Sequence, residues 1–328
     1  MADAVPPVVS VVIPTHNRRE LLLRAVASVL DQDTAARVEI VVVDDASTDD
    51  TGAVLKRAHP DDARVRLLTT PRRYASGARN LGFAAARGAF VCFLDSDDCW
   101  LPGTLDVLLE VFERFPALAF VSVDGSTFAT AQQPALQRVV AGDSPGWSHP
   151  RFGDAPLQDE PFVRRDGTPL RLRRGDFFPA IVFGDLFYLS GMLIRRDGVT
   201  CAGPFNERFR YYNDWEFFAR LCRCGDGAHL DYDGFRRDTG RSDQISRRRP
   251  PLALARRHLY LLRSQLRRGD TARYEIPLHA ALAHAQYRMA VCLMEAGRNG
   301  AARRYLARCV RLGYRPLRCV LRFGGLRW

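Results

Sequence analysis

Residues 89–98 read AFVCFLDSDD, an apolar run followed directly by a cluster of three carboxylates. A short apolar run that stops at polar residues predicts a buried strand. Two similar runs stand upstream, VVSVVI at 8–13 and VEIVVV at 38–43, and a shorter one spans 65–69. Strands that are apolar on both faces are typical of parallel sheets covered by helices. These runs therefore predict the centre of a buried parallel sheet.

Helical patterns alternate with these strands. Apolar spacing and alanine-rich composition predict helices at about 18–31, 50–59, 77–87 and 103–115, and a further strand at 119–123. This alternation predicts an α/β fold with a mostly parallel sheet flanked by helices. Ligands of such sheets bind beyond the carboxyl ends of the strands. We therefore expect three polar clusters to share one rim: Thr15-His16-Asn17, Asp44-Asp45 and Asp95-Ser96-Asp97-Asp98.

The downstream half is less regular. Residues 125–180 are dense in Pro, Gly, Asp and Arg, which is typical of a long loop region that lines a substrate site. Beyond them we expect a strand at 192–195, a helix at 214–221, an edge strand at 228–232, and helices at 252–268, 276–296, 299–312 and 316–322. The predicted organisation is one domain over 1–240, with halves at about 8–125 and 126–240, and an Arg-rich helical region over 241–328.

Composition and charge describe a folded protein with two unlike parts. The 328 residues are 47% apolar and 26% charged, which excludes a disordered or collagen-like chain. The net charge is +11, yet residues 241–328 alone carry +16 and the remainder −5. A basic segment of this kind suits nucleic acid, an anionic membrane or phosphorylated substrates, and simple solvated charge is the alternative.

The cysteines and the termini indicate a compartment. None of the eight cysteines forms a CxxC pair, so we expect reduced thiols in the cytoplasm. No signal peptide and no apolar run of about 18 residues is visible. We therefore expect a cytoplasmic protein, either soluble or peripheral on the inner face of the cell membrane.

Several residue clusters could carry chemistry. Holding the carboxylates of Asp95, Asp97 and Asp98 ionised together requires a cation, and oxygen ligands favour Mg²⁺ or Mn²⁺. The alternative is a solvated loop in which Asp98 caps the next helix.

Asp214 begins a predicted helix, where a carboxylate is stabilised as the anion. That position suits both an N-cap and a general base, and the spacing alone does not separate the two.

Four segments together resemble the family 2 glycosyltransferases, which have the GT-A fold and use nucleotide-diphosphate sugars. They are VSVVIPTHNRRELLLRAVASVLDQ, VEIVVVDDASTDDT, ARNLGFAAARGAFVCFLDSDDCWLP and NDWEFFARL. The resemblance covers about 8–125 closely and 181–225 more loosely. It implies an inverting, metal-dependent transferase that moves a sugar, UDP-linked by family habit, to a hydroxyl of a sugar or lipid-linked acceptor in bacterial surface polysaccharide or glycoconjugate synthesis.

The resemblance also assigns roles to positions of this chain. Asp97 and Asp95 match the DxD motif that binds Mn²⁺ or Mg²⁺ and the diphosphate, and Asp214 matches the catalytic base. The Glu that precedes this base in the family is replaced by Asn213. The remaining matches are nucleotide contacts, at Pro14, Thr15, Asp45, Arg79 and Asn80.

Two rival functions remain open. A sugar nucleotidyltransferase would also be α/β with an acidic metal site, but it usually needs a Gly-rich loop and a lysine, where this chain has PTHNRRE. A non-catalytic sugar- or membrane-binding protein on the same fold is the second rival, motivated by Asn213 and the basic tail. For the tail itself we favour an anionic membrane surface over a helical cap. We expect no nucleic-acid partner, because no recognised motif accompanies the charge.

Overall fold

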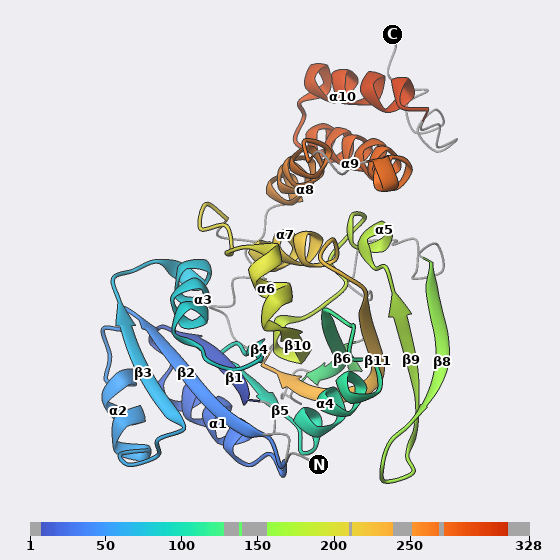
Figure 1. Cartoon of the computed structure of the whole chain (residues 1–328). Coiled ribbons are helices and arrows are strands. Elements are labelled where there is room, and N and C mark those ends of the chain that lie inside the picture. Colours follow the sequence, from blue (N-terminus) through green and yellow to red (C-terminus); the bar gives the residue numbers. More distant parts are fainter. Residues whose placement is uncertain are drawn as a thin grey trace. The chain divides into compact units, whose positions relative to one another are not determined.

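The computed structural model describes residues 8–127, 138–139, 156–209, 212–238, 251–268 and 272–313. The chain divides into two compact units, residues 1–244 and 245–328 (Figure 1). The predicted helix at 316–322 lies outside the described residues, as does much of the irregular stretch that begins at 125. The α/β fold with a C-terminal helical region is as predicted.

A parallel sheet forms the first half of the larger unit. Its strands are β1 (Val8–Thr15), β2 (Arg37–Asp45), β3 (Val65–Thr70) and β4 (Phe90–Phe93). They stand in the order β3-β2-β1-β4, all parallel, so their carboxyl ends meet at one edge. The connecting helices are α1 (Arg19–Leu30), α2 (Thr51–Ala58) and α3 (Tyr74–Ala85).

The second half continues the same sheet in mixed directions. Beyond β4 the order is β10-β6-β11-β9-β8, with β5 and β7 paired to β11 and β6. Strand β11 lies between β6 and β9, so its prediction as an edge strand was wrong. Strands β8 and β9 form an antiparallel hairpin inside the stretch predicted as loop. The elements are β5 (Asp98–Trp100), α4 (Thr104–Arg114), β6 (Phe120–Thr127), β7 (Arg138–Val139), β8 (Leu157–Val163), β9 (Pro169–Gly175), α5 (Phe178–Ile181), β10 (Met192–Arg195), α6 (Arg196–Ala202), α7 (Asn213–Leu221) and β11 (Gly227–Arg237).

Both faces of the sheet are covered. On one face, Val11 and Ile13 of β1 join Leu22 of α1 in the main apolar cluster. On the opposite face, α3 approaches β1 closely at Gly82, where an added Cβ would lie 2.3 Å from Val12 Cγ1. Only glycine allows that approach. The close packing of α3 fixes the side chains it carries relative to the strand ends.

A disulfide joins two neighbouring helices of the larger unit. Cys201 at the end of α6 is bonded to Cys224, just after α7, with the two Cα atoms 5.9 Å apart. The expectation of reduced thiols was therefore wrong for this pair. Twenty-three residues separate the two cysteines in sequence, and only the packing of α6 beside α7 brings them together.

The C-terminal unit is helical. It contains α8 (Pro251–Leu266), α9 (Glu275–Glu295) and α10 (Asn299–Arg311). Leu262, Leu278 and Ala281 are fully buried in its interior. Across the described parts of the chain, none of the helices has the length and apolar character needed to cross a membrane.

Candidate active site

The predicted rim forms where β1, β2 and β4 end. Thr15 ends β1 and pairs in register with Asp44 of β2, and Asp95 follows β4 by two residues. Pro14 and Thr15 are both buried at this edge. The Oγ1 atom of Thr15 is buried without a hydrogen-bond partner among the described residues. Such a hydroxyl can form a hydrogen bond to a molecule bound at the rim.

Asp45 is buried at the end of β2 and forms hydrogen bonds to the segment before α3. Its carboxylate accepts a hydrogen bond from Arg72 Nη1 at 2.7 Å and one from the backbone N–H of Arg73 at 2.6 Å. Its backbone carbonyl lies 2.9 Å from His16 Nδ1. Asp45 thus holds the segment before α3 against the turn after β1. Its predicted contact with a nucleotide stays a prediction.

The acidic segment after β4 faces arginines from distant elements. Arg79 of α3 is 2.5 Å from Asp95, and Arg18, which precedes α1, is 2.9 Å from Asp97. Desolvation alone would raise the pKa of the Asp95 carboxyl, but the charge and hydrogen bond of Arg79 outweigh it, so this pKa lies below its usual value. Asp95 is therefore an anion at neutral pH.

Asp98 behaves differently from its neighbours. Burial, reinforced by the negative charge of Asp97, raises the pKa of the Asp98 carboxyl well above its usual range. The hydroxyl of Ser190 donates to Asp98 at 2.6 Å and accepts from the backbone N–H of Asp95 at 3.2 Å. Arg237, at the end of β11, lies opposite Asp98 in the β5–β11 register and over the ring of Tyr188. Asp98 is thus a structural member of the cluster.

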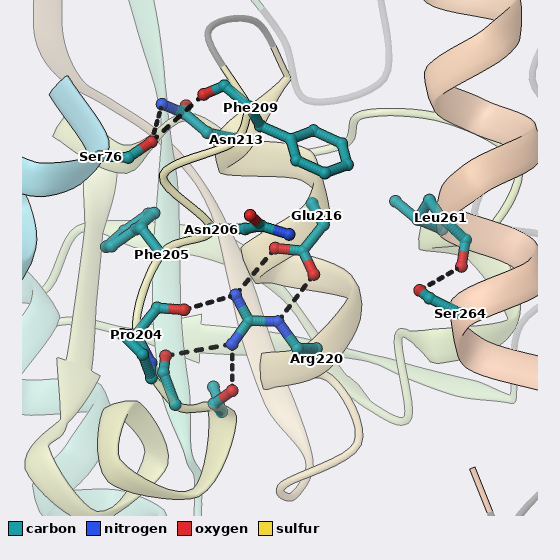
Figure 2. Close-up of polar contacts among 12 residues, drawn as sticks. Ser76, Pro204, Phe205, Asn206, Phe209, Asn213, Glu216, Arg220, Leu261 and Ser264 are labelled. Atoms are coloured by element: carbon teal, nitrogen blue, oxygen red, sulfur yellow. Dashed lines mark hydrogen bonds and ion pairs between the residues drawn. The ribbon is translucent and has the colours of Figure 1, made fainter. Parts of the chain in front are cut away.

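Arg79 connects the acidic segment to α7. Besides Asp95, it donates to Asn213 Oδ1 at 3.4 Å. Asn213 in turn donates to Ser76 Oγ at 2.7 Å, as Figure 2 shows. Asp214, the predicted base, is the next residue and lies in the first turn of α7. The buried Nε of Arg79 has no hydrogen-bond partner among the described residues. One guanidinium therefore joins the two parts of the predicted site and keeps a donor available.

The side chain of Asn80 forms hydrogen bonds to the loop that contains Phe205. Its side chain accepts from the N–H of Phe205 at 2.8 Å and donates to the carbonyl of Phe205 at 3.0 Å. The Phe205 ring stacks on Phe217 of α7, with ring centroids 4.2 Å apart. A predicted nucleotide contact at Asn80 stays a prediction, while these bonds give it a structural role between α3 and α7.

An arginine on α7 fixes the other side of that loop. Arg220 forms two hydrogen bonds to Glu216, at 2.9 and 2.8 Å, and donates to the carbonyls of Ala202, Gly203 and Pro204 (Figure 2). Both charged side chains are largely buried. The helix that carries Asp214 is therefore anchored to the segment that follows α6.

Backbone strain is concentrated around the rim. Among the described residues, the non-glycine residues with positive φ are Asn17, Ala46, Tyr74 and Tyr212. Each borders a segment discussed above: the turns after β1 and β2, the start of α3 and the start of α7. Left-handed residues of this kind commonly mark functional sites.

The donor atoms of the rim suit a divalent cation that a ligand helps to bind. Within the described ranges, no group of three or more His, Cys, Asp or Glu side chains comes together to hold a metal ion. Mg²⁺, however, is usually bound by one or two carboxylates together with substrate phosphates. Asp95 and Asp97 provide such carboxylates beside the cations Arg18 and Arg79. The residues therefore fit a metal shared with a diphosphate.

Sequence reasoning missed four side chains of this site. Arg18, Arg72 and Arg237 are single arginines in a chain with 48 Lys and Arg residues, and Ser190 lies in no recognised motif. Arg18 directly follows the predicted polar cluster Thr15-His16-Asn17, which was an available signal, and Arg72 lies between a predicted strand and a predicted helix. Arg237 and Ser190 had none, because they reach the rim only through the pairing of β11 and β10 with the rest of the sheet.

Comparison with known sequences gives one family. The profile described as Glycosyl transferase family 2 matches residues 10–174. An uncharacterised glycosyltransferase of a Nostoc species is 43% identical over 144 residues, 40% of this chain and 44% of that protein. A GalNAc(5)-diNAcBac-PP-undecaprenol beta-1,3-glucosyltransferase of Campylobacter jejuni is 40% identical over 106 residues, 32% of this chain and 34% of that protein. The matches thus span less than half the length of these relatives.

Comparison with solved structures shows the same fold. Staphylococcus aureus TarS in complex with UDP-GlcNAc aligns with a TM-score of 0.60 at 16% identity, over 85% of this chain and 72% of that one. The mannosyltransferase PcManGT of Pyrobaculum calidifontis, in complex with GDP-Man and Mn²⁺, aligns with a TM-score of 0.58 at 18% identity, over 98% and 80%.

Proposed function

Because this chain belongs to glycosyl transferase family 2, we propose that it transfers a sugar from a UDP-linked donor to a hydroxyl acceptor with inversion of configuration. The observation that carries the proposal is Arg79, which contacts Asp95 on the donor side and Asn213, the neighbour of Asp214, on the acceptor side. The relatives include proteins named for succinoglycan and teichuronic acid biosynthesis. These relatives support an acceptor in bacterial polysaccharide or glycoconjugate synthesis.

The donor binds at the rim in this proposal. Thr15 and Asp45 contact the nucleoside, and the guanidinium of Arg79 donates to the diphosphate through its unpartnered Nε. Asp95 and Asp97 would hold a Mg²⁺ or Mn²⁺ ion, which would supply positive charge to the diphosphate. The TarS and PcManGT complexes, with UDP-GlcNAc and with GDP-Man and Mn²⁺, support this class of ligand.

The acceptor reacts at Asp214. This carboxylate stands in the first turn of α7. It takes the proton from the acceptor hydroxyl while that oxygen forms the new bond to the anomeric carbon and the bond to the diphosphate oxygen breaks. The leaving group departs from the opposite face, so a single displacement inverts the configuration. Asn80, Arg220 and Phe217 position the loop and helix beside this base.

Thermal unfolding with UDP, GDP and dTDP, each with and without Mn²⁺, tests the donor site. Ligand at 100 times its dissociation constant stabilises by about 2.7 kcal/mol, or roughly 5–10 °C for a domain of this size. We expect such a shift with UDP only when Mn²⁺ is present, and its loss in Asp97→Asn. The matched control Asp50→Asn alters an exposed carboxylate in another loop and should keep the shift. No shift with any of the three nucleotides would contradict the proposal.

We propose further that the C-terminal unit docks on an anionic membrane. Arg256, Tyr260 and Arg263 are exposed on α8 at spacings of four and three residues, so they form one stripe of the helix, and the exposed Arg267 directly follows its end. Arginine with an aromatic residue suits an anionic lipid interface. The Campylobacter jejuni relative is named for an acceptor on PP-undecaprenol, and an acceptor of that kind would lie in the membrane.

Vesicle sedimentation tests the docking. The protein should pellet with phosphatidylglycerol vesicles at low salt and be released at high salt, because the attraction is electrostatic. A triple variant with Arg256→Gln, Arg263→Gln and Arg267→Gln should no longer pellet with the vesicles. A control variant with Arg57→Gln and Arg64→Gln, which are exposed arginines of the larger unit, should still pellet. Equal pelleting of both variants would refute this docking surface.

A further inference from the structure

Arg18 reaches the acidic segment from the turn between β1 and α1. Its Nη1 atom is 2.9 Å from Asp97 Oδ2 and donates to Ser96 Oγ at 3.5 Å. The side chains of Arg18 and Asp97 are 20% and 17% exposed, so water screens the pair only partly. The guanidinium therefore sits on a carboxylate that the proposed function assigns to a divalent cation.

The backbone holds Arg18 in this position. Its N–H donates to Thr51 Oγ1 at 3.1 Å, and the N–H of Asn17 donates to Ser47 Oγ at 2.9 Å. The carbonyl of Arg18 accepts the hydrogen bond from Leu22 that opens α1. Arg19, the next residue, instead forms an exposed ion pair with Asp50. The turn thus fixes the backbone from which the Arg18 side chain extends.

Arginines already supply positive charge to the acidic segment without a metal. Arg18 pairs with Asp97 and Arg79 pairs with Asp95, and Arg237 lies opposite Asp98 in the β5–β11 register. A divalent cation alone at Asp97 would meet the positive guanidinium at the same oxygens, and like charges this close repel strongly. A diphosphate brings the negative charge that both cations can share.

We propose that Arg18 occupies the cation's place on Asp97 until a nucleoside diphosphate binds. This inference rests on the proposed function. With the diphosphate bound, the guanidinium moves from Asp97 to a phosphate oxygen and leaves the carboxylate to the metal. Metal and nucleotide therefore bind cooperatively, and by thermodynamic linkage each raises the affinity for the other by the same factor.

Titration of Mn²⁺, followed by the loss of its free electron-spin resonance signal, measures this coupling with and without UDP. We expect Arg18→Gln to bind Mn²⁺ alone about tenfold more tightly than wild type, and UDP to enhance that binding about tenfold less, within the usual range of coupling factors. Arg18→Lys keeps the charge and should restore much of the coupling. Arg19→Gln is the matched control and should behave as wild type.

The outcomes separate the two proposals. If wild type binds Mn²⁺ and UDP cooperatively and Arg18→Gln, shown to be folded by its melting curve, does the same, the role of Arg18 is overturned while the donor site stands. The role of Arg18 is also overturned if Arg19→Gln binds Mn²⁺ as tightly as Arg18→Gln does. In that case the loss of any nearby positive charge would explain the tighter binding. If wild type binds no Mn²⁺ even with UDP, the donor site fails and this inference fails with it.

Discussion

Replacing Arg220 by methionine should destabilise the larger unit by about 3–5 kcal/mol, the usual cost of removing one partner of a buried ion pair. The structure gives the reason. Arg220 and Glu216 are 13% and 7% exposed, and two hydrogen bonds join them. Without the guanidinium, the Glu216 carboxylate stays buried and unpaired. The three backbone carbonyls that accept hydrogen bonds from Arg220 also lose their donor.

A double-mutant cycle measures how much of this loss of stability comes from the pairing of Arg220 with Glu216. Glu216→Gln removes the buried charge, so the double variant should recover at least about 1 kcal/mol of the loss seen in Arg220→Met, within the range of coupling measured for contacting residues. Arg64→Met is the control, because Arg64 also pairs closely with a carboxylate, Asp62, but does so at the surface. An exposed pair of this kind contributes about 0–1 kcal/mol.

Urea unfolding followed by tryptophan fluorescence is the assay, since Trp215 lies on α7 beside the pair and is buried. The reasoning is refuted if Arg220→Met loses less than 1 kcal/mol, or if its loss and that of Glu216→Gln simply add. Either result would mean that the loop after α6 is held by other contacts.

Two further predictions concern stability. Glu39 accepts hydrogen bonds from Ser10, Arg66 and the backbone N–H of Arg87, which lower the pKa of its carboxyl although burial opposes this; Glu39→Gln should therefore cost about 1–3 kcal/mol at pH 7. Because the folded pKa is depressed, this difference should persist above about pH 5 and vanish as the pH falls through the folded pKa, and urea unfolding from pH 7 to pH 3 that shows a constant difference would contradict it. The Cys201–Cys224 disulfide closes a loop of 23 residues and should contribute about 3 kcal/mol, so a reducing agent should lower the melting temperature of wild type and leave Cys201→Ser with Cys224→Ser unchanged; equal responses of both proteins would show that the bond does not stabilise the fold.

Strand ends were the part of the site that could be predicted from sequence. An apolar run that stops at a carboxylate marks both a buried strand and its carboxyl end, and parallel pairing then places Thr15, Asp45 and Asp95 on one edge without any further information. The position of Asp214 left it open between an N-cap and a general base, and only the resemblance to a family motif predicts the base. Arg79 links it to that edge through Asn213, a contact between residues 134 positions apart that no local pattern encodes.

The remaining features depend on long-range pairing. Strand β11 becomes central because β9 pairs with it, although the hairpin that provides β9 lies in a stretch with poor periodicity. Arg237 arrives beside Asp98 through the same strand, and Cys201 meets Cys224 through the packing of α6 and α7. In each case the partner is chosen by the tertiary fold, so composition and spacing could not identify it.

The kcat of Asp214→Asn, measured with the same UDP-sugar donor and acceptor as wild type, tests the central claim most directly. The variant keeps the size of the side chain but cannot accept the proton of the acceptor hydroxyl. The account predicts a fall in kcat of about 10²–10⁴-fold, with the affinity for UDP and Mn²⁺ within twofold of wild type. A variant as active as wild type would show that Asp214 is not the base, and would contradict the mechanism proposed for this site.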